Sequence, residues 1–81
     1  MSILEKKLTE LIARDFGVSP EEVTPAFIHE WREKKIYPAP NYDFNGKYGG
    51  YLYAGLEVLS PSEIEAILRV SDDFLAQFAA A

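Results

Sequence analysis

The 81-residue sequence contains no cysteine and a single histidine. Without cysteine, the chain can form neither a disulfide nor a thiolate metal site, and one histidine cannot supply the paired imidazoles of a helical zinc site. Long apolar runs are also missing, because charged residues begin at Glu5 and no stretch approaches the ~20 residues of a membrane-spanning helix. These absences predict a protein with no bound metal, no signal peptide and no membrane contact, and we expect a cytoplasmic location.

Catalytic motifs are missing as well. Carboxylates are plentiful, but neighbours such as Asp72 and Asp73 point in different directions on a helix and do not converge on one substrate. The clustered glycines of the central segment are not followed by the Lys-Ser/Thr pair of a phosphate-binding loop. A chain of this length also has little room for a walled active site. We therefore predict that the protein is not an enzyme and has no cofactor.

Positive charge is scarce. The chain has 13 acidic and 8 basic residues, so its net charge is −5. Such a chain repels nucleic acid on average, because phosphate neutralisation requires an excess of lysine or arginine on the contact face. We interpret the densest basic cluster, Arg32, Lys34 and Lys35, as cations favourably placed in the last turn of a helix. We expect no direct contact with nucleic acid.

Length and composition predict a single domain that covers residues 1–81. With 48% hydrophobic and 26% charged residues, the chain is typical of a folded globule. Apolar residues recur at helical spacing over residues 2–16 and predict an amphipathic helix. Gly17 follows at the position where a left-handed C-cap ends such a helix. This helix is the first of three that we expect in the N-terminal part of the chain.

Two more helix starts follow directly. Ser19 and Glu22 form a capping box with proline at the first helical position, which predicts a very short second helix. The Thr24-Pro25 pair repeats the signal and predicts a third helix that runs to about Lys35.

The segment that follows is rich in tyrosine and glycine. All five tyrosines and four of the five glycines lie between residues 36 and 56. The Asn45-Gly46 pair is typical of a two-residue hairpin turn, because both turn positions require a positive φ angle. It predicts a short Tyr/Gly-rich β-hairpin around this turn.

A last capping box, Ser60 with Glu63, begins a long C-terminal helix whose apolar stripe stays in phase to Phe78. The expected fold class is therefore α+β: a small, helix-dominated single domain with three N-terminal helices, a short β-hairpin and a long C-terminal helix. The expected core consists of Leu4, Leu8, Leu11, Ile12, Phe16, Val23, Phe27, Trp31, Leu56, Ile64, Ile67, Leu68 and Leu75.

The tyrosine-rich segment is the expected binding surface, because tyrosine combines a large apolar ring with a polar tip and is enriched where proteins meet. Period-two alternation would let Leu52 and Ala54 face the core while Tyr51 and Tyr53 face outward. The alternative is that so small a domain recruits these rings to its core. The residues expected to bind a partner are Tyr42, Phe44, Tyr48, Tyr51 and Tyr53.

These features predict a small, non-enzymatic interaction or regulatory module, of the kind carried by phages and accessory operons. Its expected partner is a larger protein, and the chain could also form a homodimer. An alternative comes from residues 8–23, where the spacing of Ala13, Gly17 and Val23 resembles the helix-turn-helix families of DNA-binding proteins. That resemblance implies a nucleic-acid-linked regulator, although Pro25 falls where the recognition helix should continue. A further alternative is an acidic nucleic-acid mimic that inhibits a DNA- or RNA-binding machine through its charge.

Overall fold

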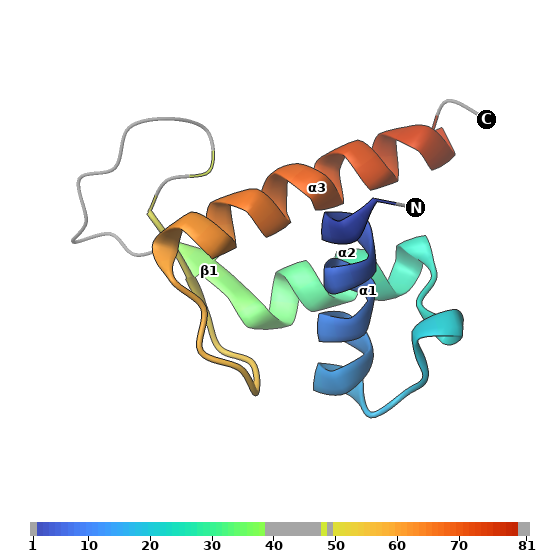
Figure 1. Cartoon of the computed structure of the whole chain (residues 1–81), viewed down its shortest axis with the longest axis horizontal. Helices are drawn as coiled ribbons and strands as arrows, with labels where there is room; N and C mark the ends of the chain where they lie inside the picture. Colours follow the sequence, from blue (N-terminus) through green and yellow to red (C-terminus); the bar gives the residue numbers. More distant parts are fainter. Residues whose placement is uncertain (1, 39–47, 49, 80–81) are drawn as a thin grey trace.

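A computed structural model describes residues 2–38, 48 and 50–79 of the chain (Figure 1). This part is mostly helical, with one antiparallel pair of short strands, so its class is roughly α+β. The elements in chain order are α1 (Ile3–Phe16), the 3₁₀ turn η1 (Pro20–Glu22), α2 (Pro25–Lys35), β1 (Ile36–Pro38), β2 (Tyr51–Tyr53) and α3 (Pro61–Ala79). In Figure 1, α1 crosses α2 and α3 lies along one side of both, with the strand pair at the N-terminal end of α3.

Helix α1 is capped at both ends, by Ser2 at its start and by the predicted Gly17 at its end. The Ser2 hydroxyl accepts a hydrogen bond from the Glu5 backbone N–H at 3.1 Å, which satisfies one of the free donors of the first turn. At the other end, Gly17 adopts a left-handed conformation with φ 67°, and the Val18 N–H donates back to the Ala13 carbonyl at 2.9 Å. The predicted first helix is confirmed.

The expectation of three N-terminal helices holds in part, because the middle one is a single 3₁₀ turn. Its capping box is present, with the Glu22 side chain accepting from the Ser19 N–H at 3.0 Å. The Thr24-Pro25 start of α2 follows at once and leaves no room for a second α-helical turn. Helix α2 ends at Lys35, as predicted.

Strands β1 and β2 pair antiparallel, with Ile36 opposite Tyr53 and Tyr37 opposite Leu52. The Ala54 N–H extends the pairing by donating to the Lys35 carbonyl at 2.8 Å. The strands therefore begin where α2 ends. The predicted Asn45-Gly46 turn lies outside the described residues.

The core lies among the three helices, and Trp31 at its centre is 0% exposed. The predicted core residues Leu4 and Leu56 are wrong, because their side chains are 44% and 73% exposed. Leu4 lies in the first turn of α1, and Leu56 follows β2 with its backbone held at the surface. Sequence reasoning also omitted Ile36, which is buried where α2 passes into β1. The buried apolar residues are Leu8, Leu11, Ile12, Ala13, Ile28, Trp31, Ile36, Ile64, Ile67 and Leu68.

Helix α3 is one continuous helix, as predicted, and begins at the Ser60 capping box. The Ser60 hydroxyl accepts from the Glu63 N–H at 3.2 Å, and the Glu63 carboxylate accepts from the Ser60 N–H at 3.1 Å. Ser71, fully buried midway along this helix, satisfies its hydroxyl by donating to the Leu68 carbonyl at 2.8 Å. Among the described residues, no helix combines the length and apolarity needed to span a membrane.

Candidate functional site

Asp15, in the last turn of α1, accepts hydrogen bonds from three separate elements. Its Oδ2 atom accepts from the Trp31 indole N–H at 2.8 Å and from the Tyr53 hydroxyl at 2.6 Å. Its Oδ1 atom accepts from the Leu56 backbone N–H at 3.0 Å. One carboxylate thus fixes α2, β2 and the segment after β2 to the end of α1.

The position of the Tyr53 ring reverses one prediction. Tyr51 and Tyr53 are half-buried and pack against the core, whereas Leu52 and Ala54 are exposed. The predicted period-two alternation is confirmed, but its faces are exchanged. The reason is that the Tyr53 ring contacts Trp31, with ring centroids 6.0 Å apart, while its hydroxyl reaches Asp15. A leucine at this position could not satisfy that carboxylate.

Burial raises the pKa of the Tyr53 hydroxyl above its ordinary value of 10.0, and the hydrogen bond to Asp15 together with its negative charge raises it further. The Leu56 N–H and the Arg14 cation act in the opposite direction. Tyr53 therefore stays protonated at neutral pH and serves as a hydrogen-bond donor.

Tyr48 also lies on the core side. Its half-buried ring packs against the core, and its hydroxyl donates to Asp72 Oδ2 on α3 at 2.7 Å. The Arg32 guanidinium of α2 pairs with the other oxygen of Asp72, and the Arg69 guanidinium lies 5.9 Å from the centre of the Tyr48 ring. Tyr48 is therefore tied to α3 directly and to α2 through Asp72.

The other two predicted binding residues, Tyr42 and Phe44, lie outside the described residues. The large apolar side chains on the outward face of the strand pair are instead Tyr37 and Leu52. They are cross-strand partners and are 45% and 37% exposed. Sequence reasoning missed this pair. The available signal was Ile36, since burying it at the end of α2 places Tyr37 on the opposite face of β1.

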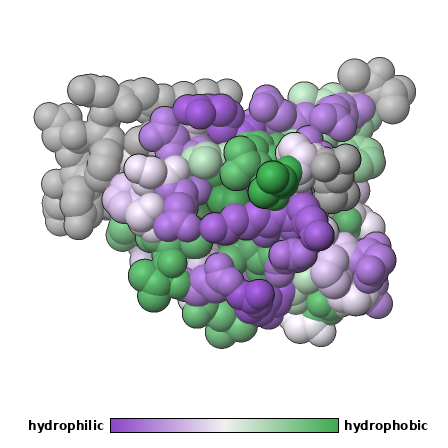
Figure 2. Space-filling view, viewed as in Figure 1, coloured by the Kyte–Doolittle hydropathy of each residue, from purple (hydrophilic) through white to green (hydrophobic). Residues whose placement is uncertain are grey.

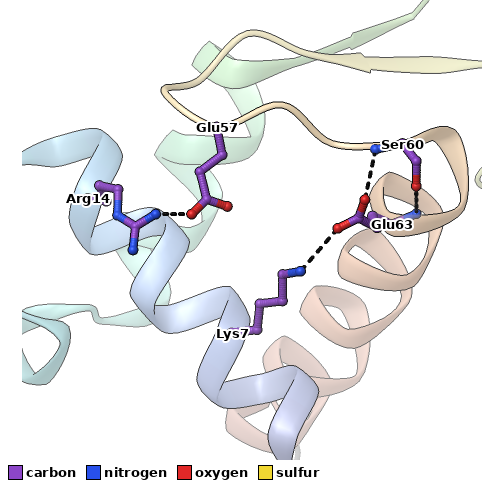
Figure 3. A network of polar contacts seen from close by, with 5 residues as sticks. All are labelled: Lys7, Arg14, Glu57, Ser60 and Glu63. Atoms are coloured by element: carbon purple, nitrogen blue, oxygen red, sulfur yellow. Dashed lines mark hydrogen bonds and ion pairs between the residues drawn. The ribbon is translucent and has the colours of Figure 1, made fainter.

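A second surface feature is a groove beside α1, with a volume of about 410 Å³. Figure 3 shows two ion pairs made by α1. Lys7 Nζ lies 3.1 Å from Oε2 of Glu63 in the first turn of α3, and Arg14 pairs with Glu57 in the segment before α3. The hydrogen bond from the Ser60 N–H, and to a lesser extent that from the Lys7 ammonium, holds the pKa of Glu63 below its usual value. The residues that line the groove are Ile3, Lys6, Lys7, Glu10, Leu11, Arg14 and Glu57.

The described residues contain no group of three or more histidine, aspartate or glutamate side chains placed to hold a metal ion. Comparison of the chain with protein-family models, with curated proteins and with solved structures finds no match.

Proposed function

We propose that this protein is a small, non-enzymatic interaction or regulatory module that binds a larger protein through the outward face of the β1–β2 pair. The observation that carries the proposal is the exposure of Tyr37 and Leu52, which lie side by side across the two strands. Large apolar side chains grouped on an exposed sheet face are the kind of residue that anchors protein interfaces.

Tyr53 on the other face of β2, and Tyr48 in the chain before β2, support this surface from within. The hydrogen bond of Tyr53 to Asp15 holds β2 against α1, and that of Tyr48 to Asp72 ties the preceding chain to α3. A face held in this way loses little conformational freedom when a partner binds, which favours affinity. Tyr42 and Phe44 belong to the same segment of sequence and remain predicted contacts.

The nucleic-acid alternatives have less support in the geometry. A helix-turn-helix would need a recognition helix after Gly17, but residues 20–22 form one 3₁₀ turn and Val23 lies beyond it. The exposed Glu21 and Glu22 of this turn would face phosphates with negative charge. We keep the regulator and the acidic mimic as outcomes that the following experiment can reveal.

The test is affinity capture from a lysate of the native host with three immobilised proteins. These are the wild type, the Tyr37→Ser/Leu52→Ser variant, and Phe78→Ser as a matched control. Phe78 is 50% exposed and lies in the last turn of α3, whose other end adjoins the strand pair (Figure 1). We expect the double variant to weaken binding of the captured protein by about 2 kcal/mol, or roughly thirtyfold, and the control to bind normally.

Because Tyr37 and Leu52 are exposed, the thermal midpoint of the double variant should stay close to that of the wild type. Equal binding by wild type and double variant would show that the partner uses another face. Nucleic acid recovered on the immobilised wild type would favour the nucleic-acid-linked regulator. Release of a captured protein by added nucleic acid would favour the acidic nucleic-acid mimic.

A further inference from the structure

We propose that the groove beside α1 is a self-association surface, in which two copies of the chain pack antiparallel across a two-fold axis. This surface is separate from the outward face of the strand pair, so the inference does not depend on the proposed function. It rests on three features: the shape of the groove, the charges on its wall, and the apolar side chains exposed at its ends.

The groove is lined by charged side chains together with the apolar residues Ile3 and Leu11, and it lies beside further exposed apolar side chains. Leu11, 2% exposed, reaches the groove from the core, and Ile3, which lines it at one end, is 87% exposed. Glu57 lines the other side and is flanked in the chain by Leu56 and Val58, which are 73% and 98% exposed. An interface between identical surfaces must be complementary to itself, and a hollow next to protruding apolar side chains can meet that condition.

The charges on the α1 wall are self-complementary. Lys7 and Arg14 are neutralised by Glu63 and Glu57, which leaves Lys6 and Glu10 as groove-lining charges. Among the described residues, neither of these two forms an ion pair, and they lie one helical turn apart with opposite signs. If two α1 helices run antiparallel with the two-fold axis level with Leu8, Lys6 of each copy faces the second copy's Glu10.

The same alignment matches the apolar ends. Along a helix with a rise of about 1.5 Å per residue, Ile3 lies as far from Leu8 on one side as Ala13 lies on the other. Ile3 therefore reaches the end of the second copy's groove where Arg14 pairs with Glu57. Leu56 and Val58 are exposed next to this pair. Two apolar contacts would then flank the central charge pairs.

A second copy fits this surface better than a strongly charged partner. The two unpaired wall charges have opposite signs. For a uniformly acidic or basic partner, attraction to one of them is offset by repulsion from the other, so such a partner gains little binding energy. Two copies each carry a net charge of −5 and repel at long range, and the alternation of Lys6 and Glu10 provides local attraction against that repulsion.

The test is sedimentation velocity over a wide range of protein concentration at low salt. We expect the wild type to associate reversibly. Lys6→Glu and Glu10→Lys should each weaken association at least about tenfold, because each places two like-charge contacts in the dimer. The charge-swapped double variant Lys6→Glu/Glu10→Lys should restore association to near the wild-type value, because each of the two pairs across the two-fold axis again has one acidic and one basic side chain.

Controls separate charge pairing from net charge and from folding. Glu33→Lys, an exposed change on α2, alters the net charge as Glu10→Lys does but removes no contact between Lys6 and Glu10. It should therefore not weaken association. Val58→Ser should weaken association without moving the thermal midpoint. Circular dichroism checks the fold of each variant.

A wild type that remains monomeric at every concentration would overturn the proposal. So would single reversals that leave association unchanged, or a double swap that fails to restore it, since either result places the contact on another surface. The Tyr37→Ser/Leu52→Ser variant should associate like the wild type, which keeps this result distinct from the outcome for the larger protein partner.

Discussion

The indole N–H of Trp31 donates to the carboxylate of Asp15 at 2.8 Å and thereby joins α2 to the last turn of α1. Trp31 is 0% exposed, so without this acceptor its N–H would be buried without a partner. The same carboxylate also accepts from Tyr53 and from the Leu56 backbone. In the described part of the chain, no buried side-chain nitrogen or oxygen lacks a partner. Asp15 is therefore central to satisfying the polar groups at the edge of the core.

Asp15→Asn should lower the free energy of unfolding by about 2–3 kcal/mol, because one amide cannot accept all three hydrogen bonds and directs an NH₂ group at a donor. Denaturation in urea measures the change. Asp73→Asn, an exposed substitution on α3, is the matched control and should stay within about 0.5 kcal/mol of the wild type. Equal stability of the two variants would show that the carboxylate is not needed.

Tyr53→Phe removes the hydrogen bond to Asp15 and should cost about 1–2 kcal/mol of stability at neutral pH. The pKa of Tyr53 is raised in the folded state, so its contribution is fully present below the ordinary value of 10.0. It is lost as the pH rises from there towards the folded-state pKa, because the unfolded chain ionises first. The stability difference between wild type and variant should therefore shrink above pH 10.0 in urea denaturation series. A difference that stays constant across this range would contradict the role of the protonated hydroxyl.

Gly55→Ala tests the close approach of the chain to this same cluster. A Cβ atom at Gly55 would overlap the Tyr53 hydroxyl and Asp15 Oδ2, and we expect a loss of about 2–3 kcal/mol. Gly17→Ala is the comparison: its Cβ would meet open space, and the cost of about 1–2 kcal/mol comes from the left-handed backbone alone. In a Tyr53→Ala background the cost of Gly55→Ala should fall, because both the hydroxyl and the ring carbon that the Cβ would overlap are gone. Additive costs would show that the two residues do not interact.

Local signals in the sequence were enough to predict the helices. Each predicted capping box is a short-range interaction, such as the Ser19 N–H with the Glu22 side chain or the reciprocal hydrogen bonds of Ser60 and Glu63, so it can be recognised within four residues of sequence. The 3₁₀ turn shows the limit of this reasoning, because a capping box indicates where a helix starts and says nothing about its length.

The faces of β2 could not be predicted locally. Alternation gives the period of a strand, but which face meets the core depends on contacts with residues distant in sequence. Here the contact is the hydrogen bond from Tyr53 to Asp15, which lies 38 residues earlier. Nothing near Asp15 in the sequence distinguishes it from Glu5 and Glu10, the other acids of α1. The same limit applies to Leu4, whose helical spacing is correct but which is 44% exposed in the first turn of α1.

Most of the basic residues in the part of the chain that the structure describes are paired with carboxylates of the same chain. Within the described part, the cations in ion pairs are Lys7, Arg14, Arg32, Lys34 and Arg69. Of the cluster at the end of α2, Arg32 pairs with Asp72 and Lys34 pairs with Glu30 at 2.7 Å. A phosphate would have to displace these carboxylates, which removes most of the gain from its own attraction.

We therefore predict no measurable affinity for duplex DNA at low salt, with fluorescence anisotropy of labelled mixed-sequence DNA as the measurement. Glu30→Gln/Asp72→Asn removes the carboxylates that hold Lys34 and Arg32 and lowers the net negative charge by two, so any latent phosphate site should be strengthened in this variant. We expect it to remain without affinity, since Glu21, Glu22 and Glu33 stay exposed. Salt-sensitive binding by the wild type that is lost on changing Arg32, Lys34 and Lys35 would contradict this prediction and favour the nucleic-acid-linked regulator.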